Sequence, residues 1–279
     1  MVRRLAWLGR ACQGGLMDGI QHQRAHGRLQ LRWGAKGLVD LFQASPMRAL
    51  FPGAEPGEPA TIAQVNVAGG LAGGDSADFE LILEDHAQAT LTAAAAEKIY
   101  RSLGPESRIT TRVALGPGAR LEWLPQEVIL FDGAMLQRRH EFALGAGAEL
   151  LLAEMLVFGR AARGEVFAHG QVFDSWRLRG PKGLLWADAL AMAAADLAHP
   201  HRFNGAQAMA TVLLAAEGAG AHLPALREIM PCTLLRPGLL LARALGDASD
   251  LRSQVAAAVP LLRAAAFGLP ARLPRLWRC

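Results

Sequence analysis

Short segments in which apolar and polar residues alternate fill the middle of the chain. Over residues 76–84, the apolar residues Phe79, Leu81 and Leu83 mostly alternate with polar ones. This period of two is typical of a strand with one buried face. Similar segments recur at residues 108–115, 119–124, 128–131, 138–144 and 149–158. Short strands with a turn every ten or so residues predict an all-β stack, barrel or solenoid, because no crossover helix fits between them.

A pattern of the form Leu-x-x-x-Ala-x-apolar recurs at three of the expected turns. Its copies begin at Leu83, Leu115 and Leu144, at intervals of 32 and 29 residues. We interpret each copy as the end of one strand, a tight turn and the start of the next. The similar intervals indicate a recurring unit. The expected fold is therefore mainly β, a solenoid-like (β-helix-like) stack of short strands with a few helices, mostly toward the C-terminus.

The pattern changes after about residue 187. Residues 188–198 are too rich in alanine to assign, so the secondary structure of residues 187–222 stays open, although residues 209–215 suit another strand. A short helix is expected over residues 223–229.

A longer helix is expected near the C-terminus. It begins at residues 247–250, with Ser249 as its N-cap, and ends at Gly268 and Pro270. Pro260 is expected to kink it. Helical spacing relates its apolar residues, which are Leu251, Val255, Val259, Leu262 and Ala266.

Composition limits the class of protein. The 279 residues, 52% of them hydrophobic, are enough for one large domain or two small ones. The sequence contains no run of about eighteen uncharged apolar residues, so no membrane span is predicted. Arg10 interrupts the apolar segment at the start of the chain too early for a signal peptide. Three cysteines lie far apart without a C-x-x-C pair, which favours a reducing compartment. We therefore expect a cytoplasmic protein.

The net charge of +4 conceals an uneven distribution. Basic residues dominate before residue 49 and at the C-terminus, whereas residues 55–97 are acidic. Such asymmetry is found in nucleic-acid-binding proteins. However, the basic residues are dispersed and no nucleic-acid-binding motif accompanies them, which favours solvated faces and protein contacts. A nucleic-acid binder would instead retain DNA in a steeply salt-dependent way.

The glycine-rich stretch NVAGGLAGGD at residues 66–75 suggests a phosphate-binding loop. Such loops open a helix, whose N-terminal N–H groups hold the phosphate. Here a strand-like segment follows, the glycine spacing differs from G-x-G-x-x-G, and Asp75 would repel an anion. The stretch is therefore expected to form a turn in which glycine allows close backbone packing.

Known catalytic patterns are missing from the sequence. Neither G-x-S-x-G nor H-E-x-x-H occurs. The close pair His199-Pro-His201 could hold a metal ion together with His222. We favour the alternative that the pair lies in a proline-containing surface loop without a metal. The scattered acids define no acid/base pair, so we expect no enzyme. The main alternative is a β-solenoid carbohydrate-active hydrolase using paired carboxylates, against which stand the single tyrosine and the missing signal peptide.

Several segments, in this order and spacing, resemble the urease accessory protein family UreD, also called UreH. They are GRLQL at 27–31, GGLAGGD at 69–75, EKIYRS at 97–102, LEWLPQEVILFDGA at 121–134, GRAARGE at 159–165 and PRLW at 274–277. The likeness runs from about residue 25 to the C-terminus. It implies a single UreD-like domain over residues 25–279, and we interpret residues 1–24 as a poorly ordered segment. The chain departs from the family's pattern at Val67-Ala68 and at Ala93.

The resemblance implies a non-catalytic maturation scaffold. Its expected partners are urease apoprotein, UreF and the GTPase UreG, with a homodimer within the complex and neither nucleic acid nor membrane. The complex would pass nickel into the urease metallocentre through a water-filled passage, so that Ni²⁺ is cargo in transit and no cofactor is tightly bound. Dispersed carboxylates suit an ion that must be released again.

The matching segments supply the candidate residues. Those expected to contact nickel in transit are Asp75, Glu97, Glu127 and Glu165. Those expected to support the motifs or pair with the acids are Gly69, Gly70, Gly73, Gly74, Lys98, Tyr100, Arg101 and Arg160. For the mixed charges at residues 97–101 and 159–165, simple ion pairs at strand ends are the competing interpretation.

Overall fold

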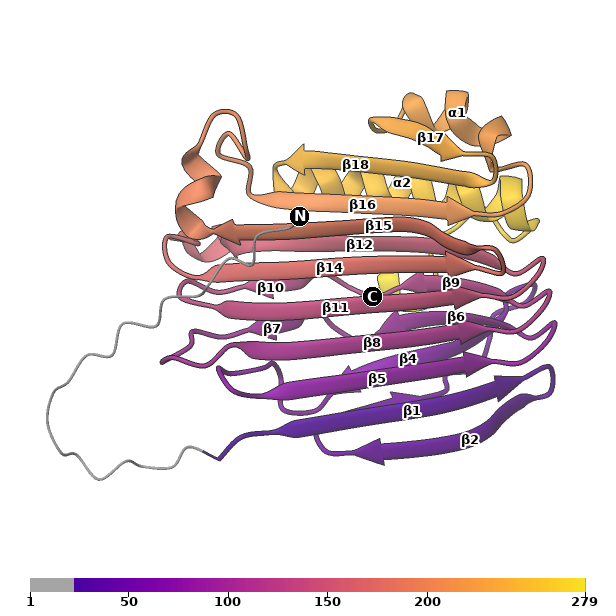
Figure 1. The fold of residues 1–279 in the computed structure, drawn as a ribbon, viewed down its shortest axis with the longest axis horizontal. Helices are drawn as coiled ribbons and strands as arrows, with labels where there is room; N and C mark the ends of the chain where they lie inside the picture. Colours follow the sequence, from indigo (N-terminus) through magenta and orange to yellow (C-terminus); the bar gives the residue numbers. More distant parts are fainter. Residues whose placement is uncertain (1–22, 279) are drawn as a thin grey trace, which may run out of the picture.

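Parallel strands stack turn upon turn in a computed structural model that describes residues 23–278. They form a β-solenoid of about 4 turns whose two sheets face each other (Figure 1). The parallel part of the first sheet contains β1 (His26–Gly34), β5 (Ser76–Leu83), β8 (Ser107–Leu115), β11 (Met135–Leu144) and β14 (Gln171–Gly180). That of the second contains β4 (Ala60–Asn66), β6 (Gln88–Ala93), β9 (Arg120–Leu124) and β12 (Glu149–Arg160). The mainly β, solenoid-like fold predicted from the sequence is confirmed.

Antiparallel strands continue both sheets at their ends. The first sheet ends with β2 (Gly37–Ala44) beside β1 and with β15 (Gly183–Ala193) beside β14. The second ends with β3 (Met47–Leu50) on one side and, on the other, with β16 (Ala208–Ala215), β18 (Leu239–Gly246) and β17 (Cys232–Arg236). Three short strands form a narrow extension along one edge of the second sheet, namely β7 (Glu97–Ile99), β10 (Val128–Leu130) and β13 (Glu165–Val166).

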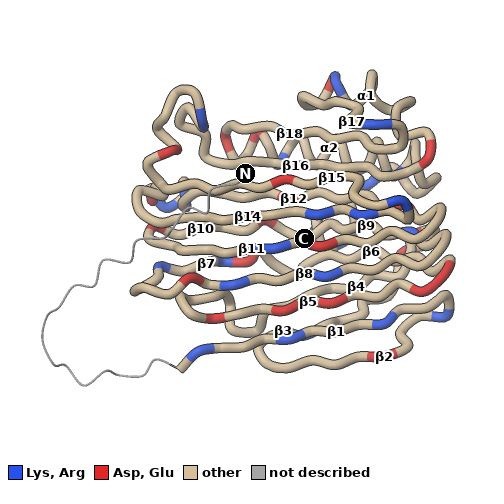
Figure 2. Tube along the Cα trace, in the orientation of Figure 1, with Lys and Arg blue, Asp and Glu red and all other residues tan. Residues whose placement is uncertain are grey.

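Alternating apolar residues fill the space between the sheets. Phe79, Leu81 and Leu83 of β5 point inward and are buried, while Ile82 lies on the outer face. The outer face of the first sheet places opposite charges in register, in the order Glu80, Arg112, Glu141 and Arg177. Both signs are accordingly interspersed across the strands (Figure 2).

Helix α2 (Ala248–Phe267) covers the outer face of the second sheet and forms a second apolar core with β12, β16 and β18. The expected N-cap Ser249 is wrong, because the Asp247 carboxylate accepts the N–H groups of both Ser249 and Asp250. The helix continues through Pro260, where the kink stays a prediction, and ends before Gly268, which has a left-handed φ of 65°.

The other assignments after residue 187 are now resolved. The alanine-rich region ends β15 and forms a 3-10 turn (Ala194–Ala198), and the expected strand is β16. The short helix is α1 (Leu223–Arg227), preceded by a 3-10 turn (Ala219–His222). Two more 3-10 turns occur, at Ala161–Arg163 and Arg275–Trp277. The segment expected to be poorly ordered falls almost wholly outside the described residues. No helix among residues 23–278 is long and apolar enough to span a membrane.

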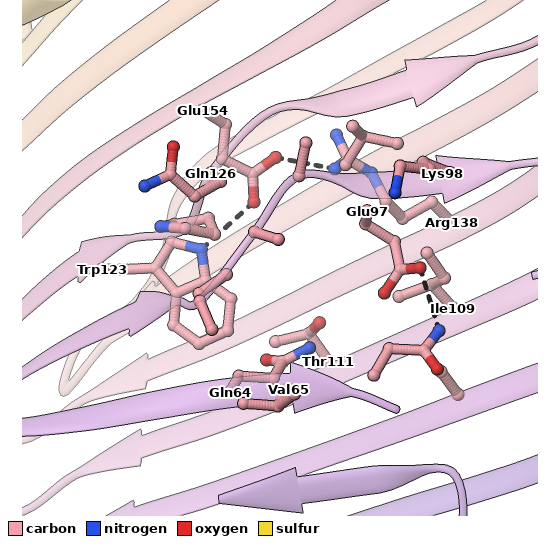
Figure 3. A pocket seen from close by; sticks show the side chains of 18 of the residues that line it. Gln64, Val65, Glu97, Lys98, Ile109, Thr111, Trp123, Gln126, Arg138 and Glu154 are labelled. Atoms are coloured by element: carbon pink, nitrogen blue, oxygen red, sulfur yellow. Dashed lines mark hydrogen bonds and ion pairs between the residues drawn. The ribbon is translucent and has the colours of Figure 1, made fainter. Parts of the chain in front are cut away.

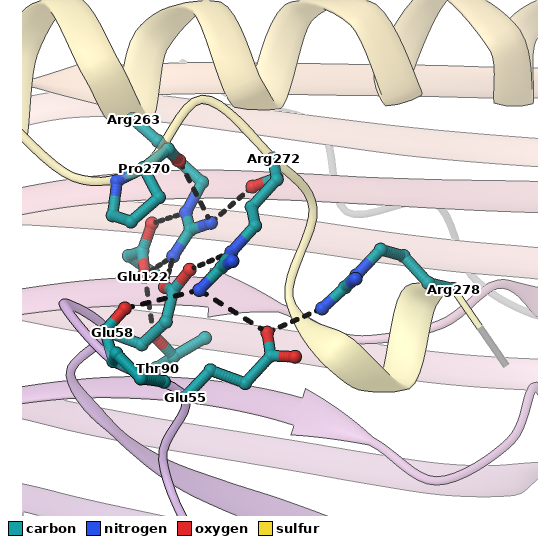
Figure 4. Close-up of polar contacts among 9 residues, drawn as sticks. Glu55, Glu58, Thr90, Glu122, Arg263, Pro270, Arg272 and Arg278 are labelled. Atoms are coloured by element: carbon teal, nitrogen blue, oxygen red, sulfur yellow. Dashed lines mark hydrogen bonds and ion pairs between the residues drawn. The ribbon is translucent and has the colours of Figure 1, made fainter.

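The C-terminal segment after α2 returns across the second sheet (Figure 4). Arg263 is fully buried and its Nε donates to Glu122 Oε1 at 2.6 Å, while its Nη2 pairs with Glu58. Arg272 Nε also donates to Glu58, at 2.8 Å. The Trp277 indole donates to the carbonyl of Leu124 at 2.9 Å. These contacts tie the C-terminal segment to the second sheet and to the segment before β4.

The predicted recurring unit is confirmed at the turns between the sheets. Leu83, Leu115 and Leu144 end β5, β8 and β11, and each turn hydrogen-bonds to the previous one, with Gly145 N 2.7 Å from Leu115 O. The third turn residue is left-handed in all three copies, which are His86, Gly118 and Gly147, with φ values of 58°, 65° and 66°. The turns stack closely, because a Cβ on Gly145 would lie 2.6 Å from the backbone nitrogen of Pro117.

Substitutions at two glycines of the third turn distinguish the energetic cost of disturbing turn stacking from that of backbone strain. A Cβ on Gly147 meets nothing within 4 Å, so Gly147→Ala is expected to cost only left-handed strain, about 1 kcal/mol of unfolding free energy. Gly145→Ala must push two stacked backbones apart and is expected to cost about 3 kcal/mol. Urea unfolding of both variants measures the difference. An equal or smaller loss for Gly145→Ala would contradict close stacking.

Candidate functional site

A cavity of about 120 Å³ lies between the two sheets beside the short strands β7 and β10 (Figure 3). Its wall includes several polar side chains, which distinguishes it from the apolar core around it. They include Gln64, Glu97, Thr111, Arg138, His140 and Glu154.

A second, smaller cavity of about 10 Å³ lies further along the solenoid. Arg138 and Glu154 line both cavities, so these two side chains lie between them. The far wall of the smaller one includes Asp188 of β15 and Arg243 of β18. These two form an ion pair at 2.5 Å, with side chains about a third exposed at 29% and 32%. Polar groups therefore run from Glu97 through the interior to the surface at Asp188.

Arg138 is held by two buried carboxylates at this place between the cavities. Its Nε and Nη2 donate to Asp174 at 3.0 and 2.8 Å, and its Nη1 pairs with Glu154 Oε2 at 2.8 Å. The indole groups of Trp123 and Trp176 donate to Glu154 and Asp174, each at 3.1 Å. All three charged side chains are at most 7% exposed. These contacts compensate charges whose burial would otherwise be very costly.

The two carboxyl groups differ in their titration. Burial raises the pKa of Glu154 although Arg138 lies beside it. Burial also opposes ionisation of Asp174, but the charge and hydrogen bonds of Arg138 outweigh it and hold the pKa of Asp174 below its ordinary value. Asp174 is therefore the firmer partner of Arg138.

His140 lies beside this cluster and stacks on Trp176, with ring centroids 3.9 Å apart. Its Nε2 is 3.9 Å from Glu154 Oε1 and 4.0 Å from Asp174 Oδ1. Neither ring nitrogen has a hydrogen-bond partner within residues 23–278. Burial, reinforced by the charge of Arg138, lowers the pKa of His140 well below its ordinary value. The ring is therefore neutral and has a free lone pair.

Glu97 is the one predicted nickel contact that lines the larger cavity. It accepts a hydrogen bond from Asn66 Nδ2 at 2.9 Å, and Lys98 lines the same cavity. Burial raises the pKa of Glu97 to about 7. Its charge therefore changes near neutral pH.

The other three predicted acids have structural contacts outside both cavities. Asp75 accepts the backbone N–H groups of Ala25 and Ala72 at 2.9 and 2.8 Å. Glu127 pairs with Arg252 of α2. Glu165 pairs with Arg160. This contact agrees with the competing interpretation of simple ion pairs at strand ends. A role of any of these acids in nickel transit stays a prediction.

The glycine stretch packs closely against residues 97–102. A Cβ on Gly70 would lie 2.6 Å from the carbonyl of Lys98, and one on Gly73 would lie 2.7 Å from that of Pro105. Leu71 and Lys98 are joined by a backbone hydrogen bond of 2.8 Å. The expected glycine turn with close backbone packing is confirmed.

Three of the other matching segments, at 97–102, 121–134 and 159–165, join the same stack. Tyr100 donates to the carbonyl of Gly69 at 3.0 Å and meets Phe131 edge to face at 5.0 Å. The Arg160 guanidinium lies 3.9 Å from the centre of the Phe131 ring. The backbones of Arg101 and Ala134 form an isolated antiparallel β-bridge. Segments far apart in the sequence therefore meet along one edge of the solenoid.

Four residues of this cluster are not among those predicted from the sequence, namely Arg138, His140, Glu154 and Asp174. One signal was available, because Arg138 and His140 occupy the same alternating positions of β11 as the buried Leu136 and Phe142. No group of three His, Cys, Asp or Glu side chains in the described residues is arranged to hold a metal ion, His199, His201 and His222 included.

Comparison with known proteins identifies the family. The model of the UreD urease accessory protein family matches residues 23–278. The chain is 48% identical over 237 residues to urease accessory protein UreD of Granulibacter bethesdensis, covering 82% of this chain and 99% of that protein. It is 41% identical over 261 residues to that of Magnetococcus marinus (88% and 90%) and 36% over 276 residues to UreD 1 of Brucella ovis (94% and 96%). The chain therefore belongs to the UreD family of urease accessory proteins.

Proposed function

We propose that this protein is a non-catalytic scaffold in urease maturation and that nickel passes through its interior toward the urease metallocentre. Membership of the UreD family supports the role in maturation. The observation that carries the passage is the run of polar groups between the sheets, from Glu97 past Arg138 and Glu154 to Asp188. An apolar core would be more stable without them, so their retention favours a function.

The residues along this route suit nickel as a passing ion. Carboxylates and a neutral imidazole are ligands that Ni²⁺ accepts. They are spread along the route, in keeping with a cargo that must be released, and no tightly bound cofactor is part of the proposal.

The same proposal assigns UreF, the GTPase UreG and urease apoprotein as partners in the cytoplasm, with a homodimer within the complex. The stack formed by Tyr100, Phe131 and Arg160 is a partly exposed edge with fixed geometry. It supports a protein contact there, because aromatic and arginine side chains are enriched at interfaces.

The carbohydrate hydrolase alternative is not favoured by the site. A glycosidase needs two carboxyl groups that flank a bound sugar. Glu154 and Asp174 are buried and bridged by Arg138, so a polysaccharide has no access to them.

The role in maturation is tested by producing urease with UreF and UreG in cells with and without this chain. We expect urease made without the chain to contain little nickel and to have at most a few per cent of the activity. Urease protein levels, measured by immunoblot, serve as the control. Fully active urease in the absence of the chain would refute the proposal.

Glu97→Gln tests the entrance of the passage. The folded pKa of about 7 lies above the ordinary 4.5, so the folded chain loses stability relative to the variant as pH rises from 4.5 to 7. Above pH 7 we expect Glu97→Gln to be more stable by about 3 kcal/mol, and equally stable below pH 4.5, as measured by urea unfolding.

The same variant is expected to lower the nickel content of co-produced urease several-fold at pH 8, because the carboxylate is lost. Glu80→Gln is the matched control, since Glu80 accepts a hydrogen bond from Gln30 away from both cavities. Unchanged nickel content in Glu97→Gln, or an equal fall in Glu80→Gln, would argue against Glu97 as an entrance residue.

A further inference from the structure

Arg138 lies between the two cavities of the proposed passage. Together with Glu154 it lines both of them. The guanidinium group bridges Glu154 and Asp174, the two buried carboxylates at this point. Figure 3 shows its contact with Glu154. The protein's own cation therefore already neutralises part of the negative charge that would attract a metal ion.

His140 supplies an independent observation at the same place. The side chain is 3% exposed, lines the larger cavity, and has no hydrogen-bond partner for either nitrogen in the described part of the chain. Buried polar groups are normally paired, and an exception calls for an explanation. Its Nε2 is about equally far from Glu154 and Asp174. The imidazole thus faces the same carboxylates as Arg138.

We propose that Arg138 keeps the passage closed as a built-in cation, and that a divalent metal ion crosses by replacing it on Glu154 and Asp174, with His140 as the third ligand. This inference rests on the proposed function, because it assigns the closing and opening of the same passage.

Charge and geometry favour this exchange. Two carboxylates carry a charge that one divalent ion balances, whereas one guanidinium leaves a negative charge uncompensated. Two ligand atoms that each lie about 2.1 Å from a divalent ion such as zinc are roughly 3.4 Å apart at a tetrahedral angle. The present separations of 3.9 and 4.0 Å between His140 Nε2 and the carboxylate oxygens of Glu154 and Asp174 are longer, so the three side chains must move slightly closer together. That requirement agrees with the lack of a preformed metal site in residues 23–278 while Arg138 is in place.

The displaced arginine has space to move. Arg138 itself lines the cavity of about 120 Å³ toward Glu97, whereas the cavity on the other side measures about 10 Å³. A swing toward Glu97 would open the route to Asp188.

The test measures Ni²⁺ binding to the full-length chain by equilibrium dialysis. Arg138→Gln is expected to bind Ni²⁺ at least tenfold more tightly than the wild type, because the carboxylates lose their competing cation. Adding His140→Phe, which preserves stacking on Trp176, is expected to reverse most of this gain. Adding Glu154→Gln should do the same.

Arg263→Gln is the matched control. Arg263 is also fully buried between two carboxylates, Glu58 and Glu122 (Figure 4), but it lines neither cavity of the passage. We expect no gain in Ni²⁺ affinity for this variant. An equal gain in both variants, or a gain in Arg138→Gln that His140→Phe leaves intact, would overturn the proposal.

Loss of stability is separated from loss of binding by thermal unfolding with and without Ni²⁺. The metal is expected to raise the Tm of Arg138→Gln by several degrees, but not that of Arg138→Gln with Glu154→Gln and Asp174→Asn. If Arg138→Gln does not fold, Arg138→Lys replaces it, since lysine cannot bridge both carboxylates in the same way. Wild-type affinity in a folded Arg138→Lys would then overturn the proposal.

The nickel content of co-produced urease distinguishes this inference from the proposed function. Arg138→Gln should trap the ion, so urease is expected to receive at least threefold less nickel. A gain in affinity with unchanged urease nickel would support the metal site and refute transport through it.

Discussion

In-register pairing of parallel strands is the constraint on which the rest of the structure depends. Each residue of a turn lies about 4.8 Å from its counterpart in the next turn. Apolar residues then form continuous columns, and a polar residue must find its partner in a neighbouring column or turn. Arg138 of β11 is paired in register with Asp174 of β14, and His140 with Trp176. Across the core, Glu154 is in register with Thr211, and Thr211 with Arg243. The polar route follows these registers.

The same constraint explains why the turns are so rich in glycine. Successive turns must stack at the spacing of the strands, which leaves no space for a side chain at Gly116 or Gly145. At the edge formed by the family's segments, Gly70 and Gly73 meet backbone carbonyls in the same way. Close turn packing holds the two sheets in a fixed relation. A cavity between the sheets can therefore persist beside a dense core.

Much of the fold was predictable from the sequence, because a period of two and a repeated turn are local patterns. Candidate site residues were harder to identify, because their partners are set by register between strands. Arg138 could be recognised as an inward-facing charge in β11, yet Asp174 is 36 residues away and belongs to another turn. Conversely, Glu127 and Glu165 lie in the matching segments, but Arg252 and Arg160 pair with them away from the cavities. At the start of α2, Asp247 and Ser249 both suit an N-cap, and the carboxylate prevails by accepting two N–H groups.

Burial of an arginine does not in itself indicate function, as the second buried arginine makes clear. Arg263 is bound by Glu58, Glu122 and the carbonyl of Arg272, so each side of its guanidinium group meets a permanent partner. These contacts fix the C-terminal segment on the second sheet. Arg138 has comparable ion pairs, but it also borders two cavities and lies beside an imidazole that has no hydrogen-bond partner among residues 23–278. The contacts of Arg263 hold segments of the chain together. The arrangement around Arg138 leaves space and an unused ligand beside a buried charge, which is the condition for exchanging one cation for another.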